Sequence, residues 1–305
     1  LALGCMHAPP ARAQAPTATI LGVVKDASGA VVPGAEITAT NTETGIARSA
    51  RSGSDGAYRL PSLAVGNYDV QAAHEGFQST VQRGLRITVG AESVMNFTLN
   101  VGAVAETVSV TAEAPIVNTT SGSLSGLVTE DRVADLPLNG RNFNDLTLLQ
   151  TGVNESRTSG TSGSINGTQY SSNGAPTRSN NFTIDGTIMN DLNNSGPAST
   201  NENTLGVEGI REFRVVTNSF SAEYGMNMGS QVILVTKSGT NQIHGSVFDF
   251  LRNSALDARN WTDGAVQPGF RRNNFGASLG GPLKTDKTFY FVNFEGLRQT
   301  RTSTL

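Results

Sequence analysis

Residues 270–301 read FRRNNFGASLGGPLKTDKTFYFVNFEGLRQTR, and their character alternates from one position to the next. Bulky or apolar residues alternate with Gly and Ser in Asn274–Gly281, and a second alternating run occupies Thr288–Gly296. Alternation with a period of two predicts β-strands. A charged turn at Pro282–Lys287 separates these two runs, and a third run precedes them at Ile243–Leu251. The sequence therefore predicts three consecutive strands with one long and one short connection.

A second strand-rich region covers residues 17–100. Short runs of β-forming residues alternate there with turns containing Gly, which accepts the positive φ of tight turns. Turns about every 8–12 residues are typical of a small β-sandwich. The predicted strands are Thr19–Val24, Ala35–Asn41, Ile46–Arg51, Ala57–Leu60, Asn67–His74, Gln82–Thr88 and Val94–Leu99.

The region between these two, residues 115–240, has a mixed character. Thr129–Leu136 is predicted to form a short helix that ends before Pro137. A second helix is predicted for Asn142–Gln150, with Gly152 beyond its end. Strands are predicted around 181–186, 209–218 and 230–236, with a long polar stretch at 154–203.

Composition limits the classes of function. The 305 residues have 22 basic and 25 acidic side chains, so the net charge is −3, which argues against a nucleic-acid partner. One Cys and three His predict neither a disulfide nor a zinc site, and no cofactor is expected. Residues 1–16 are rich in Ala and Pro, with Ala-x-Ala patterns typical of a signal-peptide remnant. A disordered terminus is the alternative for them. The chain is expected to be the N-terminal part of a longer, exported protein.

The first specific resemblance lies in GVVKDASGAVVPGAEITATNTETG (22–45) and SGSDGAYRLPSLAVGNYDVQAAHEGF (52–77). These stretches resemble the carboxypeptidase regulatory-like domain, which implies a transthyretin-like or Ig-like, carbohydrate-binding-like sandwich over 17–100. Asp26 and Asp55 are expected to cap turns, with calcium coordination as the alternative. The resemblance implies no peptidase activity, because the related carboxypeptidases keep catalysis in another domain.

Residues 101–114 connect the sandwich to the mixed region. Here Glu106, Thr107, Val108, Ser109, Val110 and Thr111 closely resemble the TonB box of outer-membrane receptors. The resemblance implies that this segment binds the C-terminal domain of TonB by adding a strand to its sheet. A plain connector, or a last strand of the sandwich, is the alternative interpretation.

The remaining motifs are LPLNGRNF (136–143), NNFTIDG (180–186) and the long run from Gly209 to Asn253. They resemble the plug of a TonB-dependent receptor of the Oar-like subgroup, and 270–301 resembles the start of its barrel. The implied fold class is mainly β: a sandwich, an α+β plug over 115–240, and the first strands of an incomplete transmembrane β-barrel over 241–305. Arg141, Asp185 and Glu223 are interpreted as internal ion pairs of the plug.

The resemblance implies an outer-membrane transporter of an unidentified nutrient, energised by TonB of the inner membrane. The sandwich and the TonB box would face the periplasm, and outer-membrane lipid would surround the complete barrel. Three strands cannot close a barrel, since bacterial barrels have at least eight. An outer-membrane carbohydrate-binding or adhesion protein is the alternative, and an enzyme is disfavoured because no nucleophile or metal-ligand set is seen.

Overall fold

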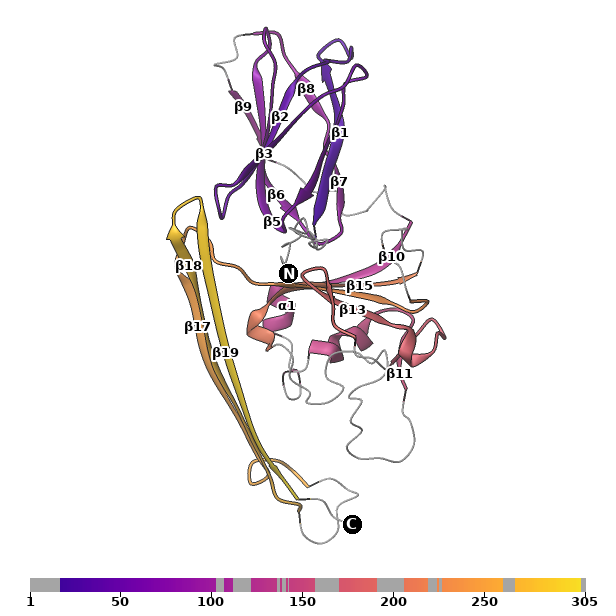
Figure 1. The fold of residues 1–305 in the computed structure, drawn as a ribbon, viewed down its shortest axis with the longest axis vertical. Helices are drawn as coiled ribbons and strands as arrows, with labels where there is room; N and C mark the ends of the chain where they lie inside the picture. Colours follow the sequence, from indigo (N-terminus) through magenta and orange to yellow (C-terminus); the bar gives the residue numbers. More distant parts are fainter. Residues whose placement is uncertain are drawn as a thin grey trace, which may run out of the picture.

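The computed structural model describes residues 17–102, 107–111, 122–135, 138, 141, 143–156, 170–190, 206–218, 224, 227–259 and 267–302. Three β-rich bodies follow one another along the chain (Figure 1). A sandwich stands on one face of a central sheet, and a long three-stranded sheet runs beside the central sheet, with one end near the sandwich. We call the middle body the central domain and the last body the outer sheet. The predicted signal remnant lies outside the described residues.

The sandwich is built from nine strands in two sheets. One sheet has the order β4-β1-β7, with β8 also paired to β1, and the other has the order β3-β2-β5-β6-β9. Its core of buried apolar side chains runs from Ala18 to Leu99 and includes Ile20, Ile37 and Phe97. The strands are β1 (Ala18–Asp26), β2 (Glu36–Asn41), β3 (Ala47–Arg51), β4 (Ala57–Leu63), β5 (Gly66–Ala73), β6 (Ser79–Ile87), β7 (Glu92–Val94), β8 (Phe97–Leu99) and β9 (Thr107–Thr111).

Gly22 allows β1 to pass close to the chain between β7 and β8. A Cβ at this position would lie 1.8 Å from the carbonyl oxygen of Met95, far inside van der Waals contact. That same oxygen accepts a 2.7 Å hydrogen bond from the hydroxyl of Tyr58. Gly22 is therefore required by packing, and its place in the family resemblance has a steric cause.

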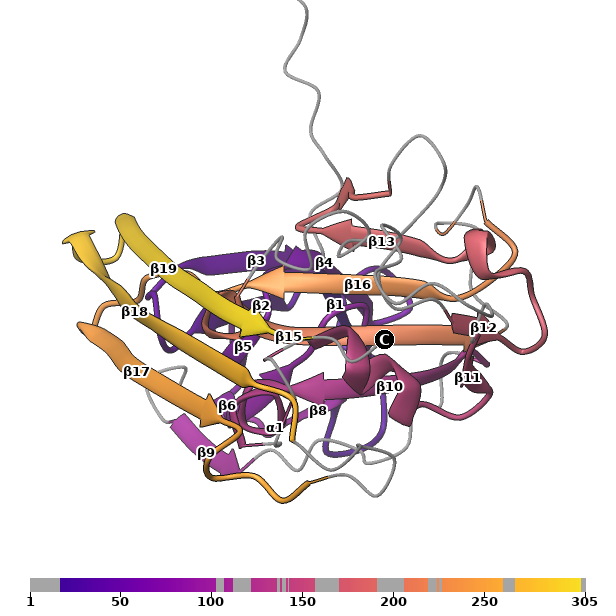
Figure 2. The same ribbon diagram turned by 90° about the horizontal axis from the view of Figure 1, so that it is seen from below.

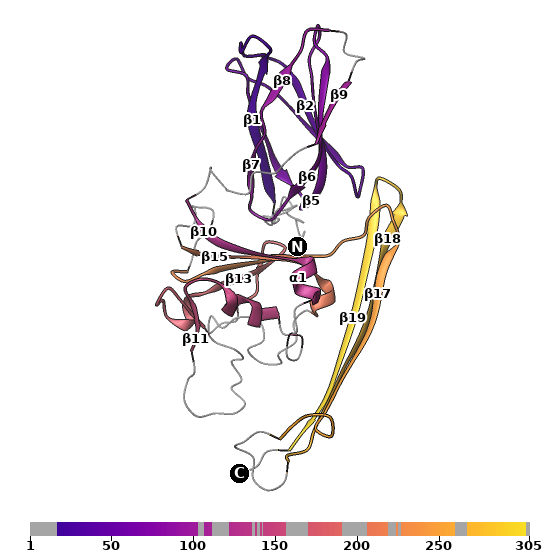
Figure 3. The same ribbon diagram turned by 180° about the vertical axis from the view of Figure 1, so that it is seen from behind.

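The central domain has a five-stranded sheet in the order β10-β15-β16-β13-β14. The helix α1 and the 3-10 helix η1 lie on the face of this sheet that points away from the sandwich (Figures 1 and 3). A two-stranded hairpin, β11-β12, lies apart from the main sheet. The elements are β10 (Leu124–Thr129), α1 (Glu130–Asp135), η1 (Phe143–Leu149), β11 (Val153–Glu155), β12 (Tyr170–Ser172), η2 (Thr177–Ser179), β13 (Asn181–Ile184), β14 (Thr187–Ile188), η3 (Val207–Gly209), β15 (Ile210–Asn218) and β16 (Gln231–Thr236).

Residues 232–235 of strand β16 are all apolar because both faces of the strand are covered. Val232 and Leu234 join the core beneath the helices, whereas Ile233 and Val235 pack with Val65 and Val89 of the sandwich. A continuous apolar run is what a strand buried on both sides requires. The sandwich is thus packed against the central sheet, in addition to being joined to it by the connecting chain.

The outer sheet is an antiparallel meander of β17 (His244–Asn253), β18 (Phe270–Lys284) and β19 (Thr288–Arg301). Seen from below, its three strands lie side by side along one edge of the molecule (Figure 2). The register places Val247, Ala277 and Phe294 in one cross-strand row. Val247 and Phe294 are 86% and 62% exposed, so the face of this row points away from the rest of the chain.

The opposite face of the outer sheet points toward the central domain and combines small or polar residues with aromatic rings such as Phe248 and Phe250. The adjacent row consists of Ser246, Ser278 and Asn293, and Ser278 is buried. In these two rows, apolar residues on the outward face of the sheet alternate with small polar residues on the inward face. This alternation is the pattern of a membrane β-barrel wall.

The structure changes several sequence-based predictions in detail. The helix predicted at 129–136 is confirmed as α1, but the segment predicted as a second helix forms the 3-10 helix η1. A 3-10 helix has three residues per turn, which puts Phe143 and Leu146 in line, and both are buried in the core. Strands β10, β11 and β12 were not predicted.

The hairpin between β18 and β19 is shorter than predicted. Strand β18 continues through Pro282 to Lys284, into the segment that the sequence marked as a turn. The register shifts between Pro282 and Lys284, so the proline lies at a bulge, where its missing N–H is tolerated. The turn itself then needs only a few residues, with Asp286 at a φ of 61°.

Candidate functional site

Arg141 connects the central domain to the outer sheet. Its Nη2 donates to Oε1 of Glu208 at 2.9 Å, and its Nε donates to Oε1 of Glu295 at 3.3 Å. Glu208 belongs to η3 of the central domain and Glu295 to β19. The guanidinium also lies 4.2 Å from the ring centre of Phe248 and 4.9 Å from that of Phe250, both on β17. A single side chain therefore bridges two bodies through two ion pairs and two cation–π contacts.

This cluster, which we call the latch, is shielded from water. The side chains of Arg141, Glu208 and Glu295 are only 12%, 15% and 16% exposed. Burial raises the pKa of Glu208, but hydrogen bonds from Ser246 and Arg141 outweigh that effect and hold the pKa below its usual value. Ser246 Oγ donates to the second oxygen of Glu208 at 2.7 Å. Glu208 is therefore ionised at neutral pH and tied to both bodies.

The backbone at Arg141 is in the left-handed region, with a φ of 56°. This conformation is unfavourable for a residue with a Cβ. It directs the side chain into the space between the central domain and the outer sheet, where the latch forms. The strain and the buried charge occur at the same residue, as is common at functional positions.

The other two predicted ion-pair residues lie elsewhere. Asp185 has a φ of 46° in the turn after β13, and its two oxygens accept hydrogen bonds from Thr236, one from N–H at 3.1 Å and one from Oγ1 at 2.7 Å. It fastens the end of β16 and takes no part in the latch. Glu223 lies outside the described residues. Of the three predicted residues, the structure brings Arg141 to a charged cluster, with partners that the sequence analysis did not single out.

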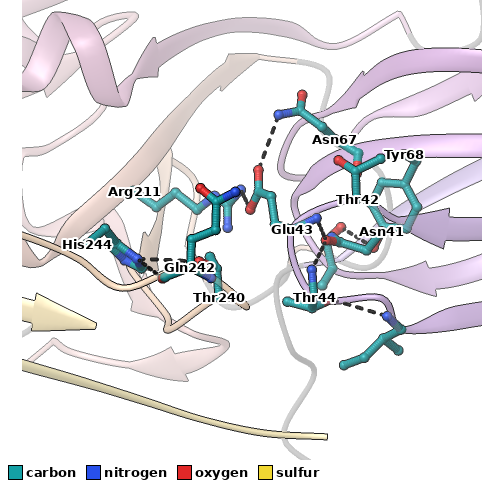
Figure 4. A network of polar contacts seen from close by, with 12 residues as sticks. Asn41, Thr42, Glu43, Thr44, Asn67, Tyr68, Arg211, Thr240, Gln242 and His244 are labelled. Carbon is teal, nitrogen blue, oxygen red and sulfur yellow. Dashed lines mark hydrogen bonds and ion pairs between the residues drawn. The ribbon is translucent and has the colours of Figure 1, made fainter. Parts of the chain in front are cut away.

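A second polar cluster joins the sandwich to the central domain (Figure 4). Glu43, in the turn after β2, accepts a 2.7 Å hydrogen bond from Nη2 of Arg211 on β15. Asn67 donates to the other oxygen of Glu43 at 3.2 Å, and Asn41 caps the turn by accepting from the N–H of Glu43. The N–H of Asn241 donates to the carbonyl of Glu43, so the chain leading to the outer sheet is fastened to the same turn.

Val89 forms a third contact, at the end of the sandwich nearest the central domain. Its N–H donates to the carboxylate of Glu212, and its carbonyl accepts from Nη1 of Arg214 at 2.9 Å. Glu212 is 1% exposed, and burial raises its pKa, although the Val89 N–H and nearby arginines act in the opposite direction. Arg214 also donates to Ser125 of β10, so β10, β15 and the sandwich meet at one side chain.

The segment that resembles a TonB box is partly described. Glu106 lies outside the described residues, and the backbone of Thr107–Thr111 forms β9. Strand β9 pairs in parallel with β6, from Ser79 opposite Thr107 to Arg83 opposite Thr111. The segment is therefore extended, as binding by strand addition requires, and it is paired with the sandwich of its own chain.

The two acidic turn residues act as caps. Asp26 Oδ1 accepts from the N–H and Oγ of Ser28 and from the N–H of Ala30, and these bonds lower the pKa of Asp26. Asp55 Oδ1 accepts from the N–H of Ala57 at 3.0 Å. Within the described part of the chain, no group of three or more His, Cys, Asp or Glu side chains is arranged to hold a metal ion.

The aromatic residues of the sandwich are occupied by packing. Tyr58, Tyr68 and Phe97 are at most 4% exposed, and the hydroxyl of Tyr68 donates to the carbonyl of Ala64. Phe77 is partly buried and packs edge-on against His74. Within residues 17–102, these four rings therefore offer no open platform on which a sugar could stack.

Comparisons with known proteins agree with this architecture. Residues 19–100 match the model of the carboxypeptidase regulatory-like domain, and residues 235–305 match that of an outer membrane beta barrel domain. These matches assign the sandwich to the first family and the outer sheet to the start of an outer-membrane β-barrel domain, which places the chain in the outer membrane. Among the described residues, no helix is long and apolar enough to cross a membrane.

A curated relative is similar to nearly the whole chain. The TonB-dependent transporter Oar of Myxococcus xanthus is 26% identical, and the match covers 96% of this chain and 28% of the relative. The chain is similar to this transporter over nearly its whole length, and it spans little more than a quarter of the transporter's own length.

Two solved receptors resemble the chain at low similarity. The siderophore receptor PirA of Acinetobacter baumannii is 21% identical with a TM-score of 0.43, and the match covers 58% of this chain and 24% of PirA. The ferric enterobactin receptor PfeA of Pseudomonas aeruginosa is 18% identical with a TM-score of 0.42, and the match covers 60% of this chain and 26% of PfeA.

Proposed function

We propose that the chain forms the N-terminal part of a transporter that takes up a nutrient across the outer membrane, using energy delivered by TonB. In this proposal the central domain is the plug, the outer sheet begins the barrel wall, and Glu106–Thr111 is the TonB box. The sandwich and the box face the periplasm. No catalytic residue is assigned, and the nutrient is not specified.

The observation that carries the proposal is the latch between Arg141, Glu208 and Glu295. A membrane-type sheet places one face against a folded domain, and a shielded ionic cluster holds the two together. This arrangement suits a plug that keeps a pore closed at rest. Ionic contacts can also re-form after the plug has been displaced, whereas a large apolar interface would oppose displacement.

The coupling step is tested with the peptide Val104–Pro115 and the periplasmic C-terminal domain of TonB, titrated in a calorimeter. We expect binding in the micromolar range. A Val108→Pro peptide is the matched control, because proline removes one main-chain donor from the strand while leaving the charge unchanged. Absence of binding by the natural peptide would refute the coupling role of this segment.

The alternative of a carbohydrate-binding or adhesion protein has less support. It depends on an aromatic platform in the sandwich, and Tyr58, Tyr68, Phe77 and Phe97 are used in packing. Glycan binding by the sandwich in a titration would restore this alternative.

A further inference from the structure

The pairing of β9 with β6 places the coupling segment on the sandwich. Five consecutive residues, Thr107–Thr111, lie in register with Ser79–Arg83 in a parallel arrangement. Strand β9 is the last strand in the sheet order β3-β2-β5-β6-β9, so among the described residues its main chain pairs with β6 on one side only. Figure 1 shows it at the margin of the sandwich, away from the central domain.

The sandwich domain is defined by residues that come before β9. The match to the carboxypeptidase regulatory-like domain ends at residue 100, before β9 begins. Parallel pairing is also slightly less stable per residue than antiparallel pairing. Strand β9 can therefore leave the sheet while the sandwich remains folded.

We propose that the edge of β6 is a resting site for the coupling segment, and that TonB must displace β9 from this edge before it can bind. The inference rests on the proposed function, since it assigns a second, internal partner to the TonB box. The sandwich then regulates access: the box is available to TonB only in the fraction of receptors in which β9 is released.

Two features of the structure make the two partners compete. Strand addition needs the main-chain donors and acceptors along one edge of the segment, and β6 occupies one of the two edges of β9. The segment is only about 17 Å long at about 3.3 Å per residue, and the body of the sandwich stands directly beside it. A folded partner would have to share this short strand with the sandwich.

The sandwich is itself fastened, so a docked box is held in place. Glu43 pairs with Arg211, and Val89 bonds to Glu212 and Arg214 of the central domain. A pull on docked β9 would therefore load the sandwich and its contacts with β15 first. A pull on released β9 would load the chain that leads directly into β10, which is an edge strand of the central sheet.

The test locks β9 in place in the full-length receptor purified in detergent. Arg83→Cys and Thr111→Cys are introduced together, at register partners at the end of the pairing, with Cys5 replaced by Ser. The matched control is Arg86→Cys with Thr111→Cys, because Arg86 is exposed on the same strand but pairs with Asn67. Binding of the TonB C-terminal domain is measured for the oxidised and the reduced form of each receptor.

We expect the Arg83/Thr111 pair to form a disulfide and the oxidised receptor to bind TonB at least tenfold more weakly than the reduced one, since apparent affinity falls with the competent fraction. The control receptor should show no difference between its two forms. Hydrogen exchange at Thr107–Thr111 should be slow in the reduced, TonB-free receptor and should become faster when Val108→Pro disrupts the strand.

The outcomes separate the two proposals. If the Val104–Pro115 peptide binds TonB but the oxidised and reduced receptors bind equally well, the resting site is refuted and the proposed function stands. Failure of the Arg83/Thr111 pair to cross-link, or rapid exchange at 107–111, also refutes the resting site. If the free peptide does not bind TonB, the proposed function fails, and this inference fails with it.

Discussion

Replacing Arg141 with Ala is expected to weaken the hold of the outer sheet on the central domain by about 3 kcal/mol. Exposed ion pairs contribute about 1 kcal/mol or less, whereas breaking a buried pair costs about 3–5 kcal/mol. The three charged side chains of the latch are only 12–16% exposed, so the value for a buried pair applies. Two cation–π contacts, with Phe248 and Phe250, add about 1 kcal/mol. The positive charge of Lys237 still stabilises the Glu208 carboxylate when Arg141 is removed, and this reduces the loss of stability.

The left-handed backbone does not complicate this comparison, because Arg and Ala both carry a Cβ and meet the same strain at a φ of 56°. The assay is a urea titration of the full-length receptor in a planar lipid bilayer, with pore conductance as the measure of plug release. At about 2 kcal/mol per molar urea, a loss of about 3 kcal/mol lowers the midpoint by about 1.5 M. Arg59→Ala is the control, since the Arg59–Glu92 pair is exposed and lies in the sandwich.

The interaction energy can be isolated by a double substitution. Glu295→Gln in the Arg141→Ala background removes one of the two carboxylates that have lost their common partner. The double variant should therefore lose less stability than the sum of the two single variants. An unchanged urea midpoint for Arg141→Ala, or strictly additive losses, would refute the reasoning that the latch holds the plug.

Two further outcomes follow from the sandwich and its contact with the central domain. Burial raises the pKa of Glu212 above its unfolded value of 4.5, so the folded state binds more protons than the unfolded state. The free energy of unfolding therefore falls as pH rises from the unfolded pKa to the folded pKa of Glu212. Glu212→Gln keeps an acceptor for the N–H of Val89 and should abolish this fall in thermal scans at pH 4.5–7, and an unchanged pH dependence would contradict the assignment. Gly22→Ala should lower the stability of the sandwich by about 3 kcal/mol, because the added methyl group clashes with Met95. Gly29→Ala is the control, since Gly29 lies in open space at a φ of 89° and its substitution should cost only about 1 kcal/mol. The protease resistance of the sandwich measures both losses, and equal losses would refute the packing argument.

Local sequence pattern predicted most of the strands well. The alternation in Asn67–His74 and in Thr288–Gly296 reappears in β5 and β19, since the two-residue period follows directly from strand geometry. Boundaries were less accurate, because a strand continues for as long as a neighbour pairs with it. Strand β18 begins at Phe270, well before the predicted Asn274, because β19 extends to Arg301 and pairs with it.

The partners of Arg141 in the latch could not be predicted from the spacing of residues in the sequence. Arg141 was identified, but its partners lie 67 and 154 residues further along the chain. Glu43 and Arg211 are separated by 168 residues and lie in two different motifs, and nothing in either motif indicates that they pair. Ion pairs between bodies depend on how those bodies are placed, and single-sequence spacing carries no information about that placement.

The sequence by itself determined that the protein is mainly β, because alternating side chains and Gly-containing turns impose local backbone geometry. It also indicated the kinship with TonB-dependent receptors and the extended character of Glu106–Thr111. Only the tertiary structure decided that the sandwich packs on the central sheet, that Arg141 bridges to the outer sheet, and that Thr107–Thr111 pairs with β6. The physical reason is that strand geometry is local, whereas pairing partners and buried charges are fixed by contacts between residues far apart in the chain.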